Sequence, residues 1–486
     1  ALSNEPLEMS GAAQRGAAEG SPCSAGMESP SLDRSLLHRY FGPIQTGSQR
    51  SSVLGLASTA FGSALLVTPS VFSSLGLVLG VAVLAFTGFA TLVSLRLLAN
   101  GAYATGHDTY GGVVAGSLGA KAALAADAVL VIYGFFVACS CFIFLKQLIP
   151  AFVKNVGLPL WLVSSDLGLL VVLAVLLAPL CLTKTVAALR HAALLAVLSL
   201  LVSVVAMCVE TPAKHAELMD RIAHGDGTAE QLPADFWWWP APGSNWVTAV
   251  PLDMAICAFA LTCHVSIFPI QQELVLPVAR RVDKVLVRAM VLVTVIYALV
   301  GVLCFLSLGP PCREQVPAEP WPSCTPPNVL ASPRFRDPVG ILAQAAMAIT
   351  VMVAIPFNLG AGRRALMSLL GCGPRPAAAA APASELAEAG GARAEEACGG
   401  PPPGGGAPRW HAPVTLLLLL AAMCVGVVFE SIDAVMAILG GFCVSSFGFA
   451  IPLAMTLALR PTIAANWPAS RIGDWLGVTP AGVVAA

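Results

Sequence analysis

Charged residues are scarce in this chain. Lys, Arg, Asp and Glu make up 11% of its 486 residues, whereas hydrophobic residues make up 57%. The mean hydropathy is +0.80. A water-soluble chain of this length would need far more polar surface, so the composition predicts an integral membrane protein. The formal net charge is −1, and without a basic face no nucleic-acid partner is expected.

Enzyme motifs are also missing. The apolar spans contain no HExxH, no GxSxG and no paired acidic motif. Function has to be argued from a site, and no such site is visible for catalysis, so a membrane enzyme is the weakest interpretation. The sequence indicates no bound cofactor and no metal site, and it gives no information on oligomeric state.

Ten segments are apolar and long enough to cross a lipid bilayer, which takes about 20 residues. They lie at about 53–73, 77–98, 121–149, 160–182, 189–209, 248–270, 285–308, 339–370, 412–430 and 433–459. Together they predict a transmembrane domain over residues 51–460. Residues 1–50 are expected to form a disordered tail, residues 372–411 a linker rich in Ala, Gly and Pro, and residues 461–486 a C-terminal tail.

Lys and Arg set the expected orientation. With a cytoplasmic N-terminus, 19 of the 26 basic residues fall inside and seven fall outside. Residues 280–288 and the pair Arg363-Arg364 carry much of this asymmetry. Because short cytoplasmic loops are enriched in Lys and Arg, the N-terminus is predicted to be cytoplasmic.

The first span can open near its centre. Residues 58–63 read STAFGS, and Pro69 follows. Gly is flexible and Pro lacks an N–H donor, so the helix can break between Gly62 and Pro69. The N–H groups at a new helix start and the helix dipole would attract a carboxylate. Small residues also allow close helix packing, which is the alternative interpretation.

The sixth span repeats this pattern. Residues 253–273 are mostly apolar, yet they include Thr262, His264, Ser266 and Pro269. In lipid every backbone N–H and C=O needs a partner within the protein, so a helix breaker or a polar side chain at depth predicts a cavity or a neighbouring helix. Taken alone, His264 would also suit a packed, hydrogen-bonded histidine.

The spacing of the two interrupted spans predicts the fold class. Spans one and six lie five apart, and an odd number of spans per repeat gives the two halves opposite topology. We therefore expect an all-α integral membrane protein with a five-plus-five inverted repeat, over residues 53–209 and 248–459, in which helices one and six are broken. Transporters of this architecture hold their substrate near such breaks.

Short motifs in these spans resemble those of a known family, the amino acid/auxin permeases, a branch of the LeuT-like transporters. The sixth-span residues that carry the resemblance are Phe259-Ala260, Cys263-His264, Pro269-Ile270 and Glu273-Leu274. Weaker matches are Gly62-Ser63 with Pro69 in the first span, Tyr297 and Gly301 in the seventh, and Pro356 with Arg363 in the eighth. The likeness covers about residues 50–460.

The resemblance implies a secondary active transporter that moves amino acids by alternating access. The substrate carboxylate would lie on N–H groups of the first break, the ammonium would meet carbonyls of the sixth, and a third-span tyrosine would close the pocket. The implied substrate-binding residues are Ser58, Gly62, Ser63, Ala64, Tyr133, Ala260 and Cys263. Ser58 and Ala64 depart from the family, which carries asparagine and glycine there. Spans nine and ten are expected to be peripheral.

A proton is the expected coupling ion. Sodium-coupled relatives place hydroxyl groups just before the eighth-span proline, where this chain has Met352 and Ala354. Na⁺ is a hard cation that requires oxygen ligands, although Thr350 and backbone carbonyls could still supply some. His264 can titrate near neutral pH, and Asp127 is a second candidate unless it is simply a charge near the inner surface.

Several alternatives stay open at this point. The chain could be a sodium-coupled neutral amino acid transporter, or a permease-like sensor of amino acids without net transport. The membrane could be the plasma membrane or that of a vacuole or lysosome. The family usually has an eleventh span, whereas residues 473–486 are too short to cross, so either the chain is truncated or this member has ten spans.

Two of the 14 cysteines differ from the rest. Cys312 and Cys324 fall in the predicted outer loop of residues 309–338, where an oxidising compartment would permit a disulfide between them. Two free thiols are the equal alternative. The other cysteines are mostly scattered within the spans, where packing explains them.

Overall fold

The computed structural model describes residues 48–183, 190–224, 237–240, 246–274, 278–308, 328–331, 335–370, 410–429 and 432–466. Nearly all of the predicted N-terminal tail and of the predicted linker lies outside these residues, and so do Cys312 and Cys324. The disordered tail, the flexible linker and the disulfide therefore stay predictions.

Regular secondary structure in the described part of the chain is entirely helical, which confirms the predicted all-α class. The elements before the sixth span are α2 (Gln49–Ala60), η1 (Ser63–Leu66), α3 (Thr68–Thr105), α4 (Tyr110–Leu118), α5 (Ala120–Val156), η2 (Leu160–Val163), α6 (Asp166–Cys181) and α7 (Arg190–Ala223). Those that follow are α8 (Trp246–Ala260), η6 (His264–Ser266), α9 (Ile267–Glu273), α10 (Ala279–Leu308), η7 (Val329–Ala331), α11 (Pro338–Leu369), α13 (His411–Val428), α14 (Ile432–Ile438), η9 (Leu439–Ala450) and α15 (Ile451–Asn466).

Eight helical segments among the described residues are long and apolar enough to cross a membrane, where the sequence suggested ten. Two of the predicted spans account for the difference. The first is divided among α2, η1 and the start of α3, and the fourth corresponds to α6, which has 16 residues. At 1.5 Å per residue α6 is about 24 Å long, somewhat less than the ~30 Å hydrocarbon core.

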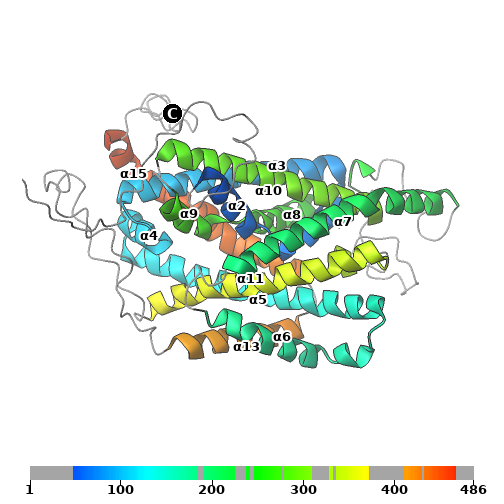
Figure 1. Ribbon diagram of the computed structural model, residues 1–486. Coiled ribbons are helices and arrows are strands. Elements are labelled where there is room, and N and C mark those ends of the chain that lie inside the picture. Colours follow the sequence, from blue (N-terminus) through cyan, green and yellow to red (C-terminus); the bar gives the residue numbers. More distant parts are fainter. Residues whose placement is uncertain are drawn as a thin grey trace, which may run out of the picture. The chain divides into compact units, whose positions relative to one another are not determined.

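Helices at matching positions of the two predicted repeats pack against each other. Helices α5 (span three) and α11 (span eight) lie side by side, and α3 (span two) packs on α10 (span seven) (Figure 1). Gly134 on α5 permits the close approach of α5 to α11, because a Cβ there would lie only 2.8 Å from the Asn358 carbonyl oxygen and from the Gly362 Cα. Small residues at a helix crossing serve this purpose in membranes, where dispersion contacts drive association.

Buried cations join helix ends in this bundle. The Lys146 ammonium on α5 donates to the carbonyls of Val427 and Phe429 at the end of α13, at 3.2 and 3.1 Å. The Arg363 guanidinium on α11 donates to the Cys181 carbonyl at the end of α6, at 3.0 Å. The last carbonyls of a helix have no partner within it, and a cation there satisfies them while favouring the helix dipole.

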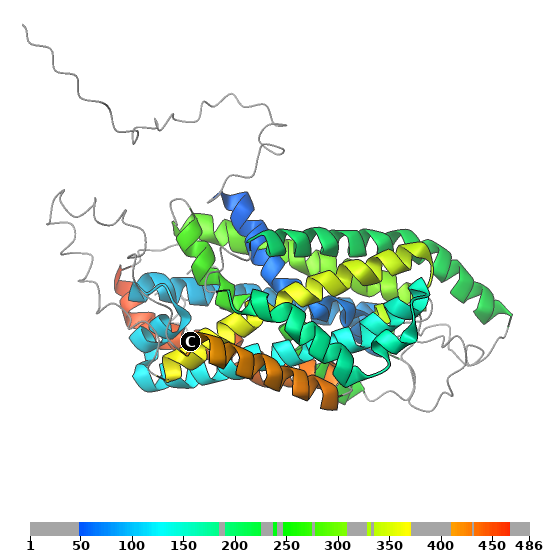
Figure 2. The ribbon, with the colours of Figure 1, turned by 60° about the horizontal axis from the view of Figure 1, so that its bottom comes forward.

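Spans nine and ten were both expected to be peripheral. Span nine is helix α13, which lies alongside α5 and α6 (Figure 2). For span ten the expectation is wrong. Span ten comprises α14, η9 and α15, and η9 is a π-helix that packs on α8 and α5. A Cβ on Gly440 would overlap the carbonyl oxygen of Ala255 in α8. Glycines therefore bring span ten into direct backbone contact with the sixth span.

Helix α3 bends sharply at Gly76, between the first and second spans. Gly76 has a φ of 72°, the left-handed region that glycine adopts without penalty. The bend frees the N–H of Val78, which donates to the Trp238 carbonyl at 3.2 Å. A Cβ on Gly76 would lie 2.8 Å from that carbonyl oxygen and from the backbone nitrogen of Trp239. The backbone of Trp238 and Trp239 thus packs against a position that only glycine can occupy.

Gly76→Ala is expected to destabilise the protein by about 2–4 kcal/mol, because backbone strain adds to the overlap with the backbone of Trp238 and Trp239. The matched control is Gly106→Ala, since Gly106 has a φ of 68° and a Cβ there would have no atom within 4 Å. The stability of both variants is measured as the fraction of detergent-solubilised protein that stays monodisperse after heating. Equal losses in the two variants would contradict close packing at Gly76.

Candidate functional site

The first span is interrupted where the sequence predicted. Helix α2 ends at Ala60, Phe61 and Gly62 are extended, and the short η1 turn begins at Ser63. The first hydrogen bond of that turn runs from the Leu65 N–H to the Gly62 carbonyl, at 3.1 Å. The N–H groups of Ser63 and Ala64 precede it, and the described residues offer them no hydrogen-bond partner. They can therefore bind a ligand that accepts hydrogen bonds.

The Tyr297 side chain of α10 holds this break together. Its hydroxyl donates to the Ala60 carbonyl at 2.8 Å. Its ring stacks on Phe61, with centroids 6.1 Å apart. Tyr297 is completely buried. The hydroxyl therefore satisfies the carbonyl of the last residue of α2, at the edge of the gap.

The sixth span is also broken. Helix α8 ends at Ala260, and the chain resumes as a helix only at His264. The hydroxyl of Thr262 donates to the Ala258 carbonyl at 2.6 Å, and its N–H donates to the Phe259 carbonyl at 3.1 Å. No donor within the described residues reaches the carbonyls of Ala260 and Leu261. These two oxygens are available to a cation.

The two breaks lie close together. The η1 turn contacts α8, and α2 contacts α9, so each half of one broken span meets a half of the other. The predicted residues Ala64, Ala260 and Cys263 are all buried. The direction in which Gly62 would carry a Cβ is empty within 4 Å. N–H donors, carbonyl acceptors and open space therefore occur in one region of the fold.

Aromatic rings line one side of this region. The ring of Tyr133 on α5 lies 6.3 Å from that of Phe259 and 4.9 Å from that of Phe447 on η9. This places the predicted third-span tyrosine beside the sixth-span break. It also brings in span ten, through a phenylalanine that no sequence motif had singled out.

His264 is fully buried at the second break and contacts span ten. Its ring meets the edges of Phe447 and Phe449, with centroids 6.0 and 5.9 Å away. Neither ring nitrogen has a hydrogen-bond partner among the described residues. A buried polar group without a partner is costly, so this imidazole is a candidate for binding a proton or a ligand.

The π-helix next to His264 exposes its carbonyls to other helices. The Tyr110 hydroxyl on α4 donates to the Phe447 carbonyl at 2.6 Å, and the Ser94 hydroxyl on α3 donates to the Gly448 carbonyl. A π-helix bonds five residues back rather than four, and such segments recur at functional sites. Span ten thereby connects the sixth-span break to helices α3 and α4.

The other predicted residues lie elsewhere. Asp127 accepts from the Ser368 hydroxyl at 2.8 Å, near the end of α11, and faces Gly111 of α4. Thr350 donates to the carbonyls of Ala346 and Ala196, at 3.1 and 3.2 Å. Asp127 and Thr350 thus have separate neighbours from His264, and the structure does not bring the three coupling candidates together.

Ser58 is half-buried on α2, and its hydroxyl donates within that helix to the Gly55 carbonyl at 2.8 Å. This intrahelical bond uses its proton, so the side chain offers a ligand only its lone pairs. Ser63, by contrast, contributes its backbone N–H to the first break. Ser58 therefore stays a weaker candidate than the backbone groups beside it.

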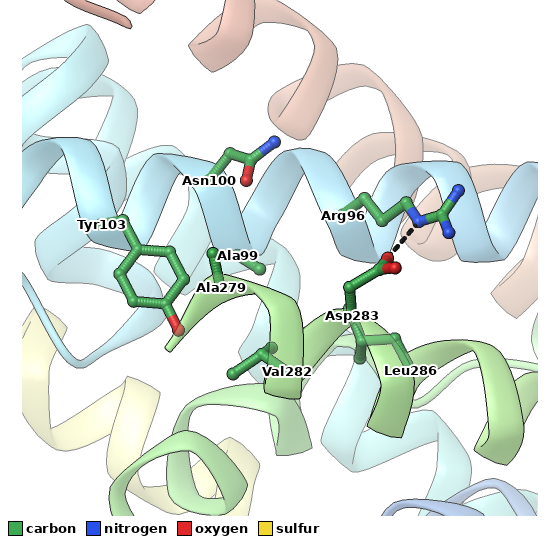
Figure 3. Close-up of a pocket in the computed structure, with 8 residues that line it drawn as sticks. All are labelled: Arg96, Ala99, Asn100, Tyr103, Ala279, Val282, Asp283 and Leu286. Carbon is green, nitrogen blue, oxygen red and sulfur yellow. Dashed lines mark hydrogen bonds and ion pairs between the residues drawn. The ribbon is translucent and has the colours of Figure 1, made fainter. Parts of the chain in front are cut away.

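A separate hollow lies between α3 and α10, near one end of both helices (Figure 3). Its lining includes Asn100 and Tyr103, together with an ion pair between Arg96 Nε and Asp283 Oδ1 at 2.6 Å. None of the predicted site residues lines this hollow. The ion pair joins the two helices, and the hollow is not part of the region between the breaks.

The role of Tyr297 at the first break was not predicted from the sequence, where this residue contributes only to the family resemblance. The available signal was its rarity, since the chain has five tyrosines and this one lies within a mostly apolar span. A buried tyrosine hydroxyl usually finds a partner, and a broken helix nearby supplies one.

The family described as transmembrane amino acid transporter protein matches residues 45–479 of this chain. The chain is 26% identical over 263 residues to vacuolar amino acid transporter 6 of Saccharomyces cerevisiae, covering 54% of this chain and 56% of that protein. It is 24% identical over 261 residues to vacuolar amino acid transporter 5 of Schizosaccharomyces pombe, covering 53% and 58%.

A third relative is AAT1 of Toxoplasma gondii, whose description as an amino acid transporter is provisional. It is 29% identical over 290 residues, covering 59% of this chain and 37% of that protein. The matches therefore span between 37% and 58% of the relatives' own length. Among solved structures, a manganese transporter of Eremococcus coleocola is similar over 90% of this chain and 94% of its own, with a TM-score of 0.41 and 11% identity.

Tyr297→Phe is expected to destabilise the protein by about 1–3 kcal/mol, because it leaves the buried Ala60 carbonyl without its partner. Thermal unfolding of the purified protein measures the loss. Ser307→Ala is the control, since Ser307 is a buried hydroxyl on the same helix that donates only to Leu303 one turn back, at 2.8 Å. If both variants unfold alike, the hydroxyl of Tyr297 does not hold the first break.

Proposed function

This chain belongs to the family of transmembrane amino acid transporter proteins, and from that membership we propose that it carries amino acids across a membrane by alternating access. The observation that carries the proposal is the pair of broken spans. They supply unpartnered N–H groups on one side and unpartnered carbonyls on the other, among the described residues. An amino acid carries both a carboxylate and an ammonium group, which such donors and acceptors can bind.

The carboxylate of the substrate would be held by the N–H groups of Ser63 and Ala64. Helix starts favour anions through both hydrogen bonds and the dipole. The ammonium would be held by the carbonyls of Ala260 and Leu261, at the C-terminal end of α8, where the dipole favours cations. The side chain of the substrate would extend toward the empty space at Gly62.

The proposed coupling ion is a proton, bound by His264. This imidazole is buried beside the sixth-span break and has no hydrogen-bond partner among the described residues. Thr350, the candidate for sodium, has separate neighbours on α7 and α11, since its hydroxyl donates to the carbonyls of Ala196 and Ala346. Protonation of His264 next to the carbonyls of the break would change how strongly that end binds an ammonium group.

Two relatives are named vacuolar amino acid transporters, and this favours a vacuole-like or lysosomal membrane over the plasma membrane. A sodium-coupled transporter of neutral amino acids is the nearest alternative, and dependence on Na⁺ separates it. A sensor without net transport is the alternative of a different class. It would bind amino acids at the same breaks but would show no concentrative uptake.

Gly62→Leu is expected to lower the apparent affinity for a transported amino acid at least about tenfold, since its side chain would fill the space that the substrate needs. Uptake of labelled amino acids into proteoliposomes measures this. Gly55→Leu is the matched control, because a Cβ on Gly55 also meets nothing within 4 Å but lies on α2, away from the gap. Normal uptake by correctly inserted Gly62→Leu would exclude the first break as the substrate site.

His264→Gln is expected to abolish stimulation of uptake by an imposed pH gradient while leaving exchange of labelled for unlabelled substrate. The reason is that glutamine preserves a polar side chain but cannot take up a proton near neutral pH. His215→Gln serves as control, because His215 contacts the Leu306 carbonyl on α10 rather than the breaks. If the pH dependence survives in His264→Gln, another group carries the proton.

A further inference from the structure

One face of α10 is exposed along much of its length. Its exposed residues recur at spacings of four, four, three, four and four, which is a single stripe on an α-helix. In order along the helix they are Arg280, Lys284, Arg288, Val291, Val295 and Leu299. The first three are basic and the last three are apolar, so the exposed face of α10 is basic before Val291 and apolar from Val291 onward.

The basic half of this stripe lies where a helix disfavours it. It occupies the first turns of α10, whose first turn contains no acidic residue, and the N-terminal end of a helix dipole repels cations. Asp283 is the acidic residue nearby, but it faces α3 and forms its ion pair with Arg96 (Figure 3). A bound anion would therefore reduce both the unfavourable interaction of the basic groups with the helix dipole and their repulsion of one another.

The apolar half fits one leaflet of a bilayer. Val291, Val295 and Leu299 are 55%, 57% and 42% exposed, as expected of residues that face acyl chains. From Arg288 to Leu299 the helix rises about 16 Å at 1.5 Å per residue. This is about half of the ~30 Å hydrocarbon core, so the basic residues would lie at the level of the lipid headgroups.

We propose that this face of α10 binds an anionic phospholipid, with the headgroup phosphate on Arg280, Lys284 and Arg288 and an acyl chain along Val291, Val295 and Leu299. The predicted orientation places the basic end in the cytoplasm, and the cytoplasmic leaflet holds most anionic lipid. Helix α10 also carries Tyr297, which donates to the Ala60 carbonyl at the first break. A lipid on this helix is thus positioned to affect the transporter from outside its substrate site.

The test is native mass spectrometry of the full chain in detergent, titrated separately with phosphatidylserine and phosphatidylcholine. Wild type is expected to retain phosphatidylserine preferentially. Lys284→Gln/Arg288→Gln is expected to weaken phosphatidylserine binding by about thirtyfold, and Lys284→Gln alone by about fivefold, from the usual contribution of a basic residue near an anionic bilayer. Phosphatidylcholine binding should stay unchanged.

The matched control is Lys121→Gln/Lys154→Gln, which removes two exposed charges from α5 instead. Equal weakening in the two double variants would overturn the proposal, as would equal retention of both lipids by wild type. Soluble glycerophosphoserine separates a lipid from a free anion. If it displaces phosphatidylserine at equal concentration, the acyl chain contributes nothing and the lipid site is wrong.

Discussion

Unpaired backbone groups within a bilayer are the constraint on which this structure depends. A helix that breaks in lipid frees N–H and C=O groups, each of which needs a partner inside the protein. At the first break the Tyr297 hydroxyl donates to the Ala60 carbonyl. The groups that remain, on Ser63, Ala64, Ala260 and Leu261, are those a zwitterionic substrate can satisfy.

The surrounding helices follow from this constraint. Helix α10 approaches the first span closely because Gly301 has no side chain, and a Cβ there would overlap the ring of Phe72. Span ten reaches the second break through glycines and a π-helix, and it surrounds His264 with phenylalanine rings. The unpartnered backbone groups and His264 therefore share one buried region, as the proposed coupling requires.

Much of the fold could be predicted from the sequence, and less of the site. Apolar length and the positions of Gly62 and Pro269 predicted the helical class and both breaks, because these depend on local chemistry. The role of Tyr297 and the involvement of Phe447 depend on contacts between spans far apart in the chain. Periodicity along one span cannot predict such contacts, and Asp127 illustrates this, since its partner Ser368 lies on another helix.

Hydrogen–deuterium exchange of residues 57–67, with and without a transported amino acid, tests the central claim most directly. The account predicts that substrate slows exchange of the Ser63 and Ala64 amides, because a carboxylate replaces water as their acceptor. Exchange at the start of α10 should not change. If substrate protects other segments and leaves residues 57–67 unaffected, the broken helices do not hold the amino acid.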